Sequence, residues 1–426
     1  MSFKDTDTGK IPSEWDVKMI QEVAEVISGA TPKTKFPEYW DGKIAWITPK
    51  DLSSHTDRHI FYGERMITDE GLKNSSAKLM PKGSVLFSSR APIGYTAIAA
   101  QELCTNQGFK SMICKPKILD NYFMYYMMNY KKNEIENIAS GSTFKEVSGK
   151  TIKEFKIPIP PIEEQKAIAK ILSDLDEKIE TNNKINKKLE EMAQAIFKQW
   201  FVDFEFPNEN GEPYKSSGGE MVESELGMIP KGWEVTKIGE CCKIIRGASP
   251  RPIQEFMSDK GIPWLKISDA SDSNSKYILN IKEYIKEEGI AKSRKVTRGT
   301  LVLSNSATPG IAKIMLTEAC VHDGWLIFSE YKNITKEYIY CHLVREREKI
   351  LSLSNGSVFR NLKTDILKSY PVIIPRNDII KKATELLISI NSNIEKNVKE
   401  TKKIEEVRDI LLPKLMSGEI RVSLEE

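Results

Sequence analysis

Two long stretches of the chain place apolar residues four and then three positions apart, which is the pattern of a coiled-coil seam. One stretch follows Pro161 and the other follows Pro375, and proline suits the first turn of a helix. The seam positions are Ile168, Leu172, Leu175, Ile179, Asn182, Asn186 and Leu189, and then Leu387, Ile390, Ile394, Asn397, Thr401, Ile404 and Leu411. The alternative is that each stretch is an amphipathic helix that packs on its own domain. Because the two seams match, we favour two long helices that pair with each other.

Polar residues within the seams indicate how the helices pair. An asparagine in a coiled-coil core is costly unless it meets another polar group, so it tends to fix the register. An antiparallel register places Asn182 opposite Thr401 and Asn186 opposite Asn397, although it also sets a leucine against Arg408. A helix of about 36 residues is about 54 Å long. Such a pair would place two globular units at opposite ends, and DNA half-sites read from one face lie one helical turn apart, about 34 Å, or slightly more for a rigid spacer of this size.

The remainder of the chain is an internal repeat. The segment Ile11–Asp51 aligns without a gap on Ile229–Asp269 at an offset of 218, and 14 of 41 positions are identical. The offset falls to 216 from Gly83 and to 215 from Gly141, as expected if loops of a shared fold differ in length. A period this long indicates two domains, because solenoid units are only a few tens of residues long.

The repeat and the seams together predict the domain organisation. Short β-type runs such as Leu301–Ser304 alternate with helical patterns, which is typical of α+β domains. We therefore predict two α+β domains related by a pseudo-twofold axis and separated by an antiparallel coiled coil. The predicted parts are a first domain at 1–160, a first long helix at 161–206, a linker at 207–228, a second domain at 229–374, and a second long helix with a C-terminal tail at 375–426.

Composition and charge add little about function. The chain has 426 residues, 40% of them apolar, and its 63 basic and 60 acidic residues nearly balance, so the net charge of +3 neither requires nor excludes nucleic acid. No run of 18 apolar residues occurs, and the first ten residues are too polar for a signal peptide, which predicts a cytoplasmic protein without a membrane anchor. The six cysteines lack the spacing of a zinc site and are predicted to be reduced thiols.

Several short motifs occur at equivalent places of the two repeats. They are an I-P-x-x-W opening (11–15 and 229–233), a G-A-[TS]-P-[KR] turn (29–33 and 247–251), W-[IL]-x-x-x-D (46–51 and 264–269), a serine-rich turn before Gly94 and Gly310, and P-I-x-x-Q at the first long helix (161–165). The duplicated arrangement resembles the specificity subunit of a type I restriction-modification system over nearly the whole chain. One departure is that the second long helix opens with the sequence PRNDI at 375–379.

This resemblance implies a non-catalytic subunit that recognises double-stranded DNA. In that family each globular domain reads one half of a bipartite, asymmetric target, and the helices hold the domains at a fixed spacing and dock two methyltransferase subunits. The methyltransferase carries S-adenosylmethionine and modifies adenine, and a separate restriction or motor subunit binds ATP and cleaves DNA. The sequence leaves open whether a motor subunit accompanies this chain, and it implies no cofactor or metal bound by the chain itself.

The sequence also lacks the motifs of the enzymes that such a system needs. Adenine methylation uses an [DN]-P-P-[YF] element, but the two prolines at 160–161 follow Ile159. The segment Gly149–Thr151 ends like a P-loop but has Phe144 where the first glycine is required. The segment His55–His59 lacks the glutamate of an H-E-x-x-H zinc site. We therefore expect no catalytic residue and no metal ligand in this chain.

Candidate DNA contacts are side chains that reach base edges or neutralise phosphates from loops. In the first domain they are Lys33, Lys35, Lys50, His55, Arg58, His59, Arg90 and Lys145. In the second domain they are Arg246, Arg251, Lys266, Asn305, Lys313 and Arg360. For each of them an ordinary solvated surface position is the alternative. Trp46 and Trp264 lie in apolar runs and are predicted to pack in the core instead of stacking on bases.

Two aromatic-rich segments and two rival functions complete the sequence-based expectations. The run Asn121–Tyr130 fits a buried helix. The run Phe197–Phe206 would either seal the first long helix to a domain or dock a partner, and we favour the seal.

A stand-alone duplicated DNA-binding regulator and a protein-binding scaffold are the alternatives to a specificity subunit. Both DNA-binding hypotheses predict that DNA binding weakens strongly with added salt, whereas the scaffold hypothesis does not.

Overall fold

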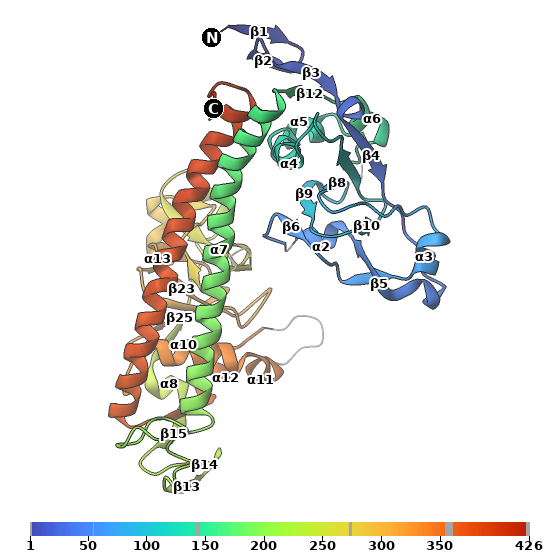
Figure 1. Ribbon diagram of the computed structural model, residues 1–426. Coiled ribbons are helices and arrows are strands. Elements are labelled where there is room, and N and C mark those ends of the chain that lie inside the picture. Colours follow the sequence, from blue (N-terminus) through green and yellow to red (C-terminus); the bar gives the residue numbers. More distant parts are fainter. Residues whose placement is uncertain (1, 54, 141–144, 272–274, 354–360, 423–426) are drawn as a thin grey trace. The chain divides into compact units, whose positions relative to one another are not determined.

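The computed structural model describes residues 2–53, 55–140, 145–271, 275–353 and 361–422 (Figure 1). The chain divides into two compact units, one formed by Met1–Thr181 with Thr401–Glu426 and the other by Asn182–Glu400. The long helices α7 (Ile162–Phe201) and α13 (Asn377–Met416) each have 40 residues and contribute to both units. Each unit therefore combines one globular domain with a part of both long helices.

The two long helices pair in antiparallel fashion inside each unit. In the first unit, an Nη1 of Arg408 lies 2.8 Å from Oδ1 of Asp176, and the chain after α13 returns to the start of α7. In the second unit, Nδ2 of Asn397 donates to Oδ1 of Asn186 at 2.9 Å. Nδ2 of Asn182 donates to Oε2 of Glu400 at 3.0 Å. Residue numbers rise along one helix as they fall along the other, which confirms the predicted antiparallel coiled coil.

The first domain is built on a five-stranded sheet with the order β4-β11-β8-β9-β6, in which β6 and β9 are parallel. These strands are Ala24–Ser28, Lys110–Cys114, Val85–Ser89, Ile93–Ala99 and His59–Ile60. A three-stranded sheet has the order β10-β5-β7, with strands Leu103–Thr105, Trp40–Ile47 and Arg65–Ile67. Two strand pairs complete the domain: β1 (Phe3–Thr6) with β2 (Gly9–Pro12), and β3 (Asp16–Met19) with β12 (Lys156–Ile159). The helices are α1 (Ile20–Val23), α2 (Pro49–Ser53), α3 (Asp69–Lys73), α4 (Asn121–Tyr130), α5 (Lys132–Asn137) and α6 (Gly149–Glu154), with a 3₁₀ turn at Pro37–Tyr39.

The second domain repeats this plan. Its five-stranded sheet has the order β16-β25-β22-β23-β19, with strands Lys243–Arg246, Trp325–Ser329, Leu301–Ser304, Ala312–Met315 and Tyr277–Ile278. A second sheet has the order β17-β20-β18-β24-β21, with strands Met257–Ser258, Tyr284–Ile285, Ile262–Leu265, Ala319–Val321 and Arg294–Val296. The strand pairs are β13 (Met221–Ser224) with β14 (Gly227–Pro230), and β15 (Glu234–Lys237) with β26 (Pro371–Ile374). The helices are α8 (Ile238–Cys241), α9 (Ile267–Ser271), α10 (Lys336–Arg345), α11 (Arg347–Ser352) and α12 (Thr364–Ser369), with 3₁₀ turns at Ile253–Glu255 and Glu287–Lys292.

The repeat extends further than the sequence match suggested. The hairpin β13–β14 begins in the segment predicted to be a linker and ends at Pro230, and its residues stand 218 positions after those of β1–β2. The helices α4 and α10 also begin in the same way: the side chain of Asp120 accepts from the N–H of Phe123, and that of Thr335, 215 positions later, accepts from the N–H of Tyr338. Both domains therefore share one fold of mixed helices and strands, which confirms the predicted α+β class.

Burial explains the apolar and aromatic segments. The run Asn121–Tyr130 is α4, whose Phe123 and Met127 are fully buried, so the predicted core helix is confirmed. Trp46 and Trp264 are 5% and 2% exposed and pack within their domains, as predicted. The segment Phe197–Phe206 is part of the core of the second unit. There the ring of Phe201 lies 4.8 Å from that of Tyr338, and the ring of Phe206 lies 5.0 Å from that of Trp233. This segment thus seals α7 to the second domain.

Candidate DNA interface

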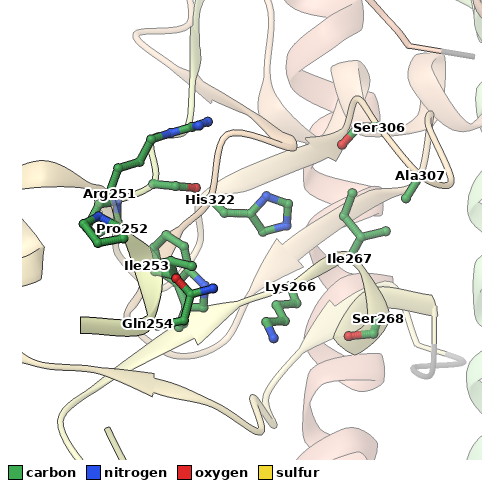
Figure 2. A pocket seen from close by; sticks show the side chains of 13 residues that line it. Arg251, Pro252, Ile253, Gln254, Lys266, Ile267, Ser268, Ser306, Ala307 and His322 are labelled. Atoms are coloured by element: carbon green, nitrogen blue, oxygen red, sulfur yellow. The ribbon is translucent and has the colours of Figure 1, made fainter. Parts of the chain in front are cut away.

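The second domain carries an open pocket of about 840 Å³ at one end of its strands (Figure 2). Figure 2 shows Arg251–Gln254 on one side and Ser306 and Ala307 on the other, with the ring of His322 between them. These residues come from three connections: the loop after β16, the turn after β22, and the end of β24. The lining residues are Ser249, Pro250, Arg251, Pro252, Ile253, Gln254, Trp264, Lys266, Ile267, Ser268, Ser306, Ala307 and His322.

Asp323 anchors the loop that follows β16. Its backbone carbonyl accepts from Nε of Arg246 at 2.6 Å, and its carboxylate accepts from Oγ of Ser249 at 2.9 Å. Burial raises the pKa of Asp323, but the Ser249 hydroxyl and the nearby Arg246 charge outweigh burial, so the pKa lies below its usual value and the group stays ionised. The guanidinium of Arg251 lies 3.8 Å from the same carboxylate, and the Arg251 side chain is 83% exposed. The anchored loop therefore presents an accessible arginine at the rim of the pocket.

His322 and Lys266 give the floor of the pocket its polarity. Burial lowers the pKa of His322, which favours the neutral ring at pH 7. Nδ1 of His322 lies 2.8 Å from the N–H of Gly324 and must act as the acceptor, so Nε2 carries the proton and can donate. Nζ of Lys266 lies 2.5 Å from Oε1 of Glu283. Beside these groups stand the apolar walls formed by Trp264 and Ile253, a mixture that suits a nucleobase edge or a sugar-phosphate unit.

Glycine is required where the loop after β16 meets the end of β24. A Cβ added to Gly247 would lie 2.2 Å from the carbonyl oxygen of His322, and one added to Gly29 would lie 2.0 Å from that of Asn106. Gly29 and Gly247 open the repeated G-A-[TS]-P-[KR] motif, so the motif marks a close approach of two backbone segments in both domains. The side-chain tether also recurs, because Thr31 donates to Gln107 at the positions equivalent to Ser249 and Asp323.

The first domain presents its own cationic side chains in the corresponding region. Lys33, Lys35, Lys50 and Lys145 are exposed. Nζ of Lys35 lies 5.0 Å from the centre of the Phe36 ring, and Nζ of Lys50 lies 2.7 Å from a carboxylate oxygen of Glu64. Arg90 is half-buried, with its guanidinium 3.4 Å from the carboxylate of Glu146.

Other residues singled out in the sequence are buried or half-buried. Arg58, Asn305 and Lys313 are 7%, 2% and 6% exposed. Burial lowers the pKa of Lys313 to about 8, and its Nζ donates to the carbonyl of Ser275 at 2.5 Å. The half-buried His59 ring is hydrogen-bonded to the Tyr122 hydroxyl at 3.0 Å, and Nε2 of His55 lies 3.0 Å from the carbonyl oxygen of His59. Arg360 lies outside the described residues.

The seam residues lie on the inner faces of the long helices. Those that are buried are Ile168, Leu172, Ile179, Asn182, Asn186, Leu387, Ile394 and Thr401. Those that are half-buried are Leu175, Leu189, Ile390, Asn397, Ile404 and Leu411. No residue of either seam is fully exposed.

Sequence reasoning missed several residues of the pocket, among them Ser249, Gln254 and His322. The signal for His322 was present, since the offset of 216 sets it opposite Asn106 in the other repeat, beside the glycine motif. Within the described residues, no group of three or more His, Cys, Asp or Glu side chains could hold a metal ion. The same residues include no helix long and apolar enough to cross a membrane.

Comparison with known proteins gives matches along nearly the whole chain. The model of the type I restriction modification DNA specificity domain matches residues 12–191 and 230–406. The type I restriction enzyme MjaIX specificity subunit of Methanocaldococcus jannaschii is 36% identical over 435 residues, which cover 99% of this chain and 96% of the relative. The HindI specificity subunit of Haemophilus influenzae is 26% identical over 472 residues, 96% of this chain and 100% of the relative. The crystal structure of the type I restriction-modification S subunit from M. genitalium superposes with a TM-score of 0.56 at 16% identity, covers 97% of both chains, and has the same fold.

Proposed function

Since this chain belongs to the type I restriction-modification DNA specificity family, whose specificity subunits are non-catalytic, we propose that each of its domains reads one half of a bipartite, asymmetric DNA target. The family assigns DNA target recognition to the chain. The division of that task between the two domains is our proposal. S-adenosylmethionine and ATP would be held by the methyltransferase and motor subunits of the assembly.

One observation carries the proposal: the two domains share a frame but differ in the side chains that the frame presents. The tethers Thr31–Gln107 and Ser249–Asp323 occupy equivalent positions, as do the glycines that the close approach requires. At the equivalent positions around them, the first domain has Thr48, Lys50, Arg90 and Asn106 where the second has Lys266, Ser268, Ser306 and His322. Different donors on one frame are what two different half-sites require.

We assign DNA contact to the accessible members of the candidate set. They are Lys33, Lys35, Lys50, Arg90 and Lys145 in the first domain, with His55 and His59 at its edge, and Arg246, Arg251 and Lys266 in the second. The side chains of Arg58, Asn305 and Lys313 are buried and bonded to protein groups, so we exclude them from direct contact. Gln254, Ser306 and His322 join the set because they line the pocket.

The outer faces of the long helices support the docking of partner subunits. Large apolar side chains that are 38% to 61% exposed occur along both helices, and they are Ile171, Ile185, Met192, Leu386, Ile388, Val407 and Ile410. These side chains offer apolar area along both helices to a partner that covers them. We propose that two methyltransferase subunits dock there and that the helices hold the two domains at a fixed spacing on DNA.

The proposal is tested by co-expressing the chain with the methyltransferase encoded beside it and sequencing the host DNA for modified adenines. We expect a stable complex and one bipartite motif with a fixed spacer. A chain that forms no complex with the methyltransferase, but binds a DNA site alone, would instead support the stand-alone regulator. A chain that binds neither partner nor DNA would support the scaffold.

Replacing Arg251 by glutamine should weaken DNA binding. The side chain is largely exposed at the pocket rim, so its charge is available to a phosphate or a guanine. We expect affinity to fall by about 5- to 20-fold and the slope of log K against log salt to fall by about 0.9 if the contact is to phosphate. Fluorescence anisotropy of the assembled complex over a salt series measures both quantities. Arg376→Gln is the matched control, because Arg376 is an exposed arginine paired with Asp378 beside α13; equal behaviour of the two variants would contradict the assignment.

A further inference from the structure

Each domain places a buried cation against the long helices at the same position of the repeat. Arg58 and Lys276 stand 218 positions apart, the offset that aligns the two domains. They are 7% and 3% exposed, although each is a charged residue. Arg58 directly precedes β6 and Lys276 directly precedes β19, and these are the edge strands of the two five-stranded sheets. The same place in the fold therefore carries a buried cation twice.

In the first unit the cation binds α7. The guanidinium of Arg58 donates through Nε to Oε1 of Glu180 at 3.0 Å and lies 3.5 Å from Oε2, and the backbone N–H of Arg58 donates to the same carboxylate at 2.8 Å. Beside this pair, the Tyr126 hydroxyl of α4 donates to Asp176 at 2.6 Å, and Arg408 of α13 binds the other oxygen of Asp176. The edge of the sheet, the core helix α4 and both long helices thus meet in one polar cluster.

In the second unit the cation binds α13. Nζ of Lys276 donates to Oδ1 of Asn391 at 2.7 Å and lies 4.1 Å from the centre of the Tyr340 ring of α10. The backbone N–H of Lys276 donates to Glu190 of α7 at 3.2 Å. Burial lowers the pKa of Lys276, because the charged ammonium has lost most of its water. Here too one buried cation connects the sheet edge with the core helix and both long helices.

The helix residues in the two clusters are also related by the repeat. Asp176 of α7 and Asn391 of α13 stand 215 positions apart, the offset that aligns the ends of the two domains and the starts of the two helices. The arrangement recurs although its chemistry differs, with an arginine and carboxylates in the first unit and a lysine, an amide and an aromatic ring in the second. Buried charges are poor stabilisers compared with apolar packing of the same volume, and in some proteins such contacts instead specify one geometry. They recur at the joint between the sheet edge and the long helices in both units. This recurrence indicates that the orientation of each sheet on the helices has to be fixed.

We propose that Arg58 and Lys276 are positioning residues that fix the angle of each sheet on the long helices and thereby set the number of base pairs allowed between the two half-sites. This inference rests on the proposed function. A spacer longer by one base pair moves a half-site by about 3.4 Å and turns it by about 35°. A domain of this size has a radius of gyration of about 15 Å. A rotation of about 10° at the joint then moves a recognition loop by a few ångströms, a distance comparable with one base-pair step.

The test uses the complete complex with its methyltransferase and DNA duplexes that carry both half-sites with a spacer of native length, one base pair shorter or one longer. We expect Arg58→Met to reduce the preference for the native spacer by about tenfold, which corresponds to about 1.4 kcal/mol. Preference for the correct base at each half-site position should stay as in the unmodified chain. Arg58→Lys, which installs the residue that the second domain has at this place, should retain most of the spacer preference. Lys78→Met is the control, because Lys78 is an exposed cation of the same domain, 4.0 Å from Glu25.

Unchanged spacer preference in folded Arg58→Met would overturn the inference, and so would loss of base preference in the first half-site, which would make Arg58 a DNA contact. If Arg58→Met loses its folded circular-dichroism signal, Glu180→Gln serves instead, because it removes the carboxylate charge and keeps an acceptor facing Arg58. The same relaxed spacer preference is expected from that variant, and an unchanged preference overturns the inference. An unmodified complex that methylates no bipartite motif would reject the proposed function itself.

Discussion

Exchanging residues 11–160 for the corresponding domain of another specificity subunit will change one half of the methylated motif and leave the other half unchanged. The first domain has cores of its own, built around Trp15 and Phe123 and around Ile47 and Phe109, and the second domain has separate ones. Each wrong base pair costs about 1–3 kcal/mol, roughly additively. The hybrid would therefore disfavour an original half-site of about three base pairs by a factor of about 10² or more.

The exchange must preserve the contacts between the first domain and the long helices. The donor domain should carry a tryptophan at position 15 and an arginine at position 58, since Glu164 and Glu180 of α7 bind these two side chains. Sequencing of modified adenines in cells that express the hybrid with its methyltransferase gives the motif. The reciprocal exchange of residues 229–374 is the matched control and should change only the other half. A motif that changes in both halves after a single exchange would contradict the division of reading between the domains.

The fold was largely predictable because its signals are local and periodic. The seams of α7 and α13 repeat every seven residues, and the pairing of Asn186 with Asn397 follows from the cost of a lone buried amide. The sequence repeat also implied that the two domains share one fold. The hairpin at Phe3–Pro12 and its counterpart at Met221–Pro230 were missed, because their sequences are polar and short and two strands alone carry little hydrophobic pattern.

The candidate site was harder to predict, because burial of a charge depends on partners that are distant in sequence. Arg58 and Lys33 look alike as basic residues in loops, yet Arg58 binds Glu180, 122 positions away, while Lys33 is exposed. Lys313 is buried through packing of β23 against β19, a contact that no local pattern reports. His322 has no motif around it in the sequence, and its place in the pocket follows only from the fold, which brings the end of β24 beside the loop after β16.

Replacing Trp15 by alanine will strongly and locally destabilise the first unit. Trp15 is fully buried in a cluster with Ile168 and Leu172 of α7 and Leu415 and Met416 of α13. Truncating a buried tryptophan to alanine typically costs about 3–5 kcal/mol. That is a large part of the 5–15 kcal/mol by which domains are usually stable.

The tryptophan has a second role that a milder substitution separates. Its Nε1 donates to Oε2 of Glu164 at 3.0 Å, and the same carboxylate receives Nε of Arg421 from the C-terminal tail at 2.6 Å. Trp15→Phe keeps an aromatic ring in the core but removes this donor together with part of the indole, so at least about 1.5–3 kcal/mol should be lost, the usual value for a hydrogen bond to a charged group. The difference between the two variants then measures the packing contribution.

Native-state hydrogen exchange followed by mass spectrometry can assign each loss to a unit. For Trp15→Ala, peptides from residues 2–19, 162–181 and 401–422 should exchange faster, while peptides from the second domain keep their protection. Trp233→Ala is the matched control at the equivalent position, where the ring packs against Phe204 and Phe206, and its effect should fall on the second unit. Each unit has its own tryptophan anchor, so each variant should lower the local stability of its own unit only. Equal loss of protection in both units from either single variant would show that the chain unfolds as one cooperative body, and the separate-core argument for domain exchange would fail with it.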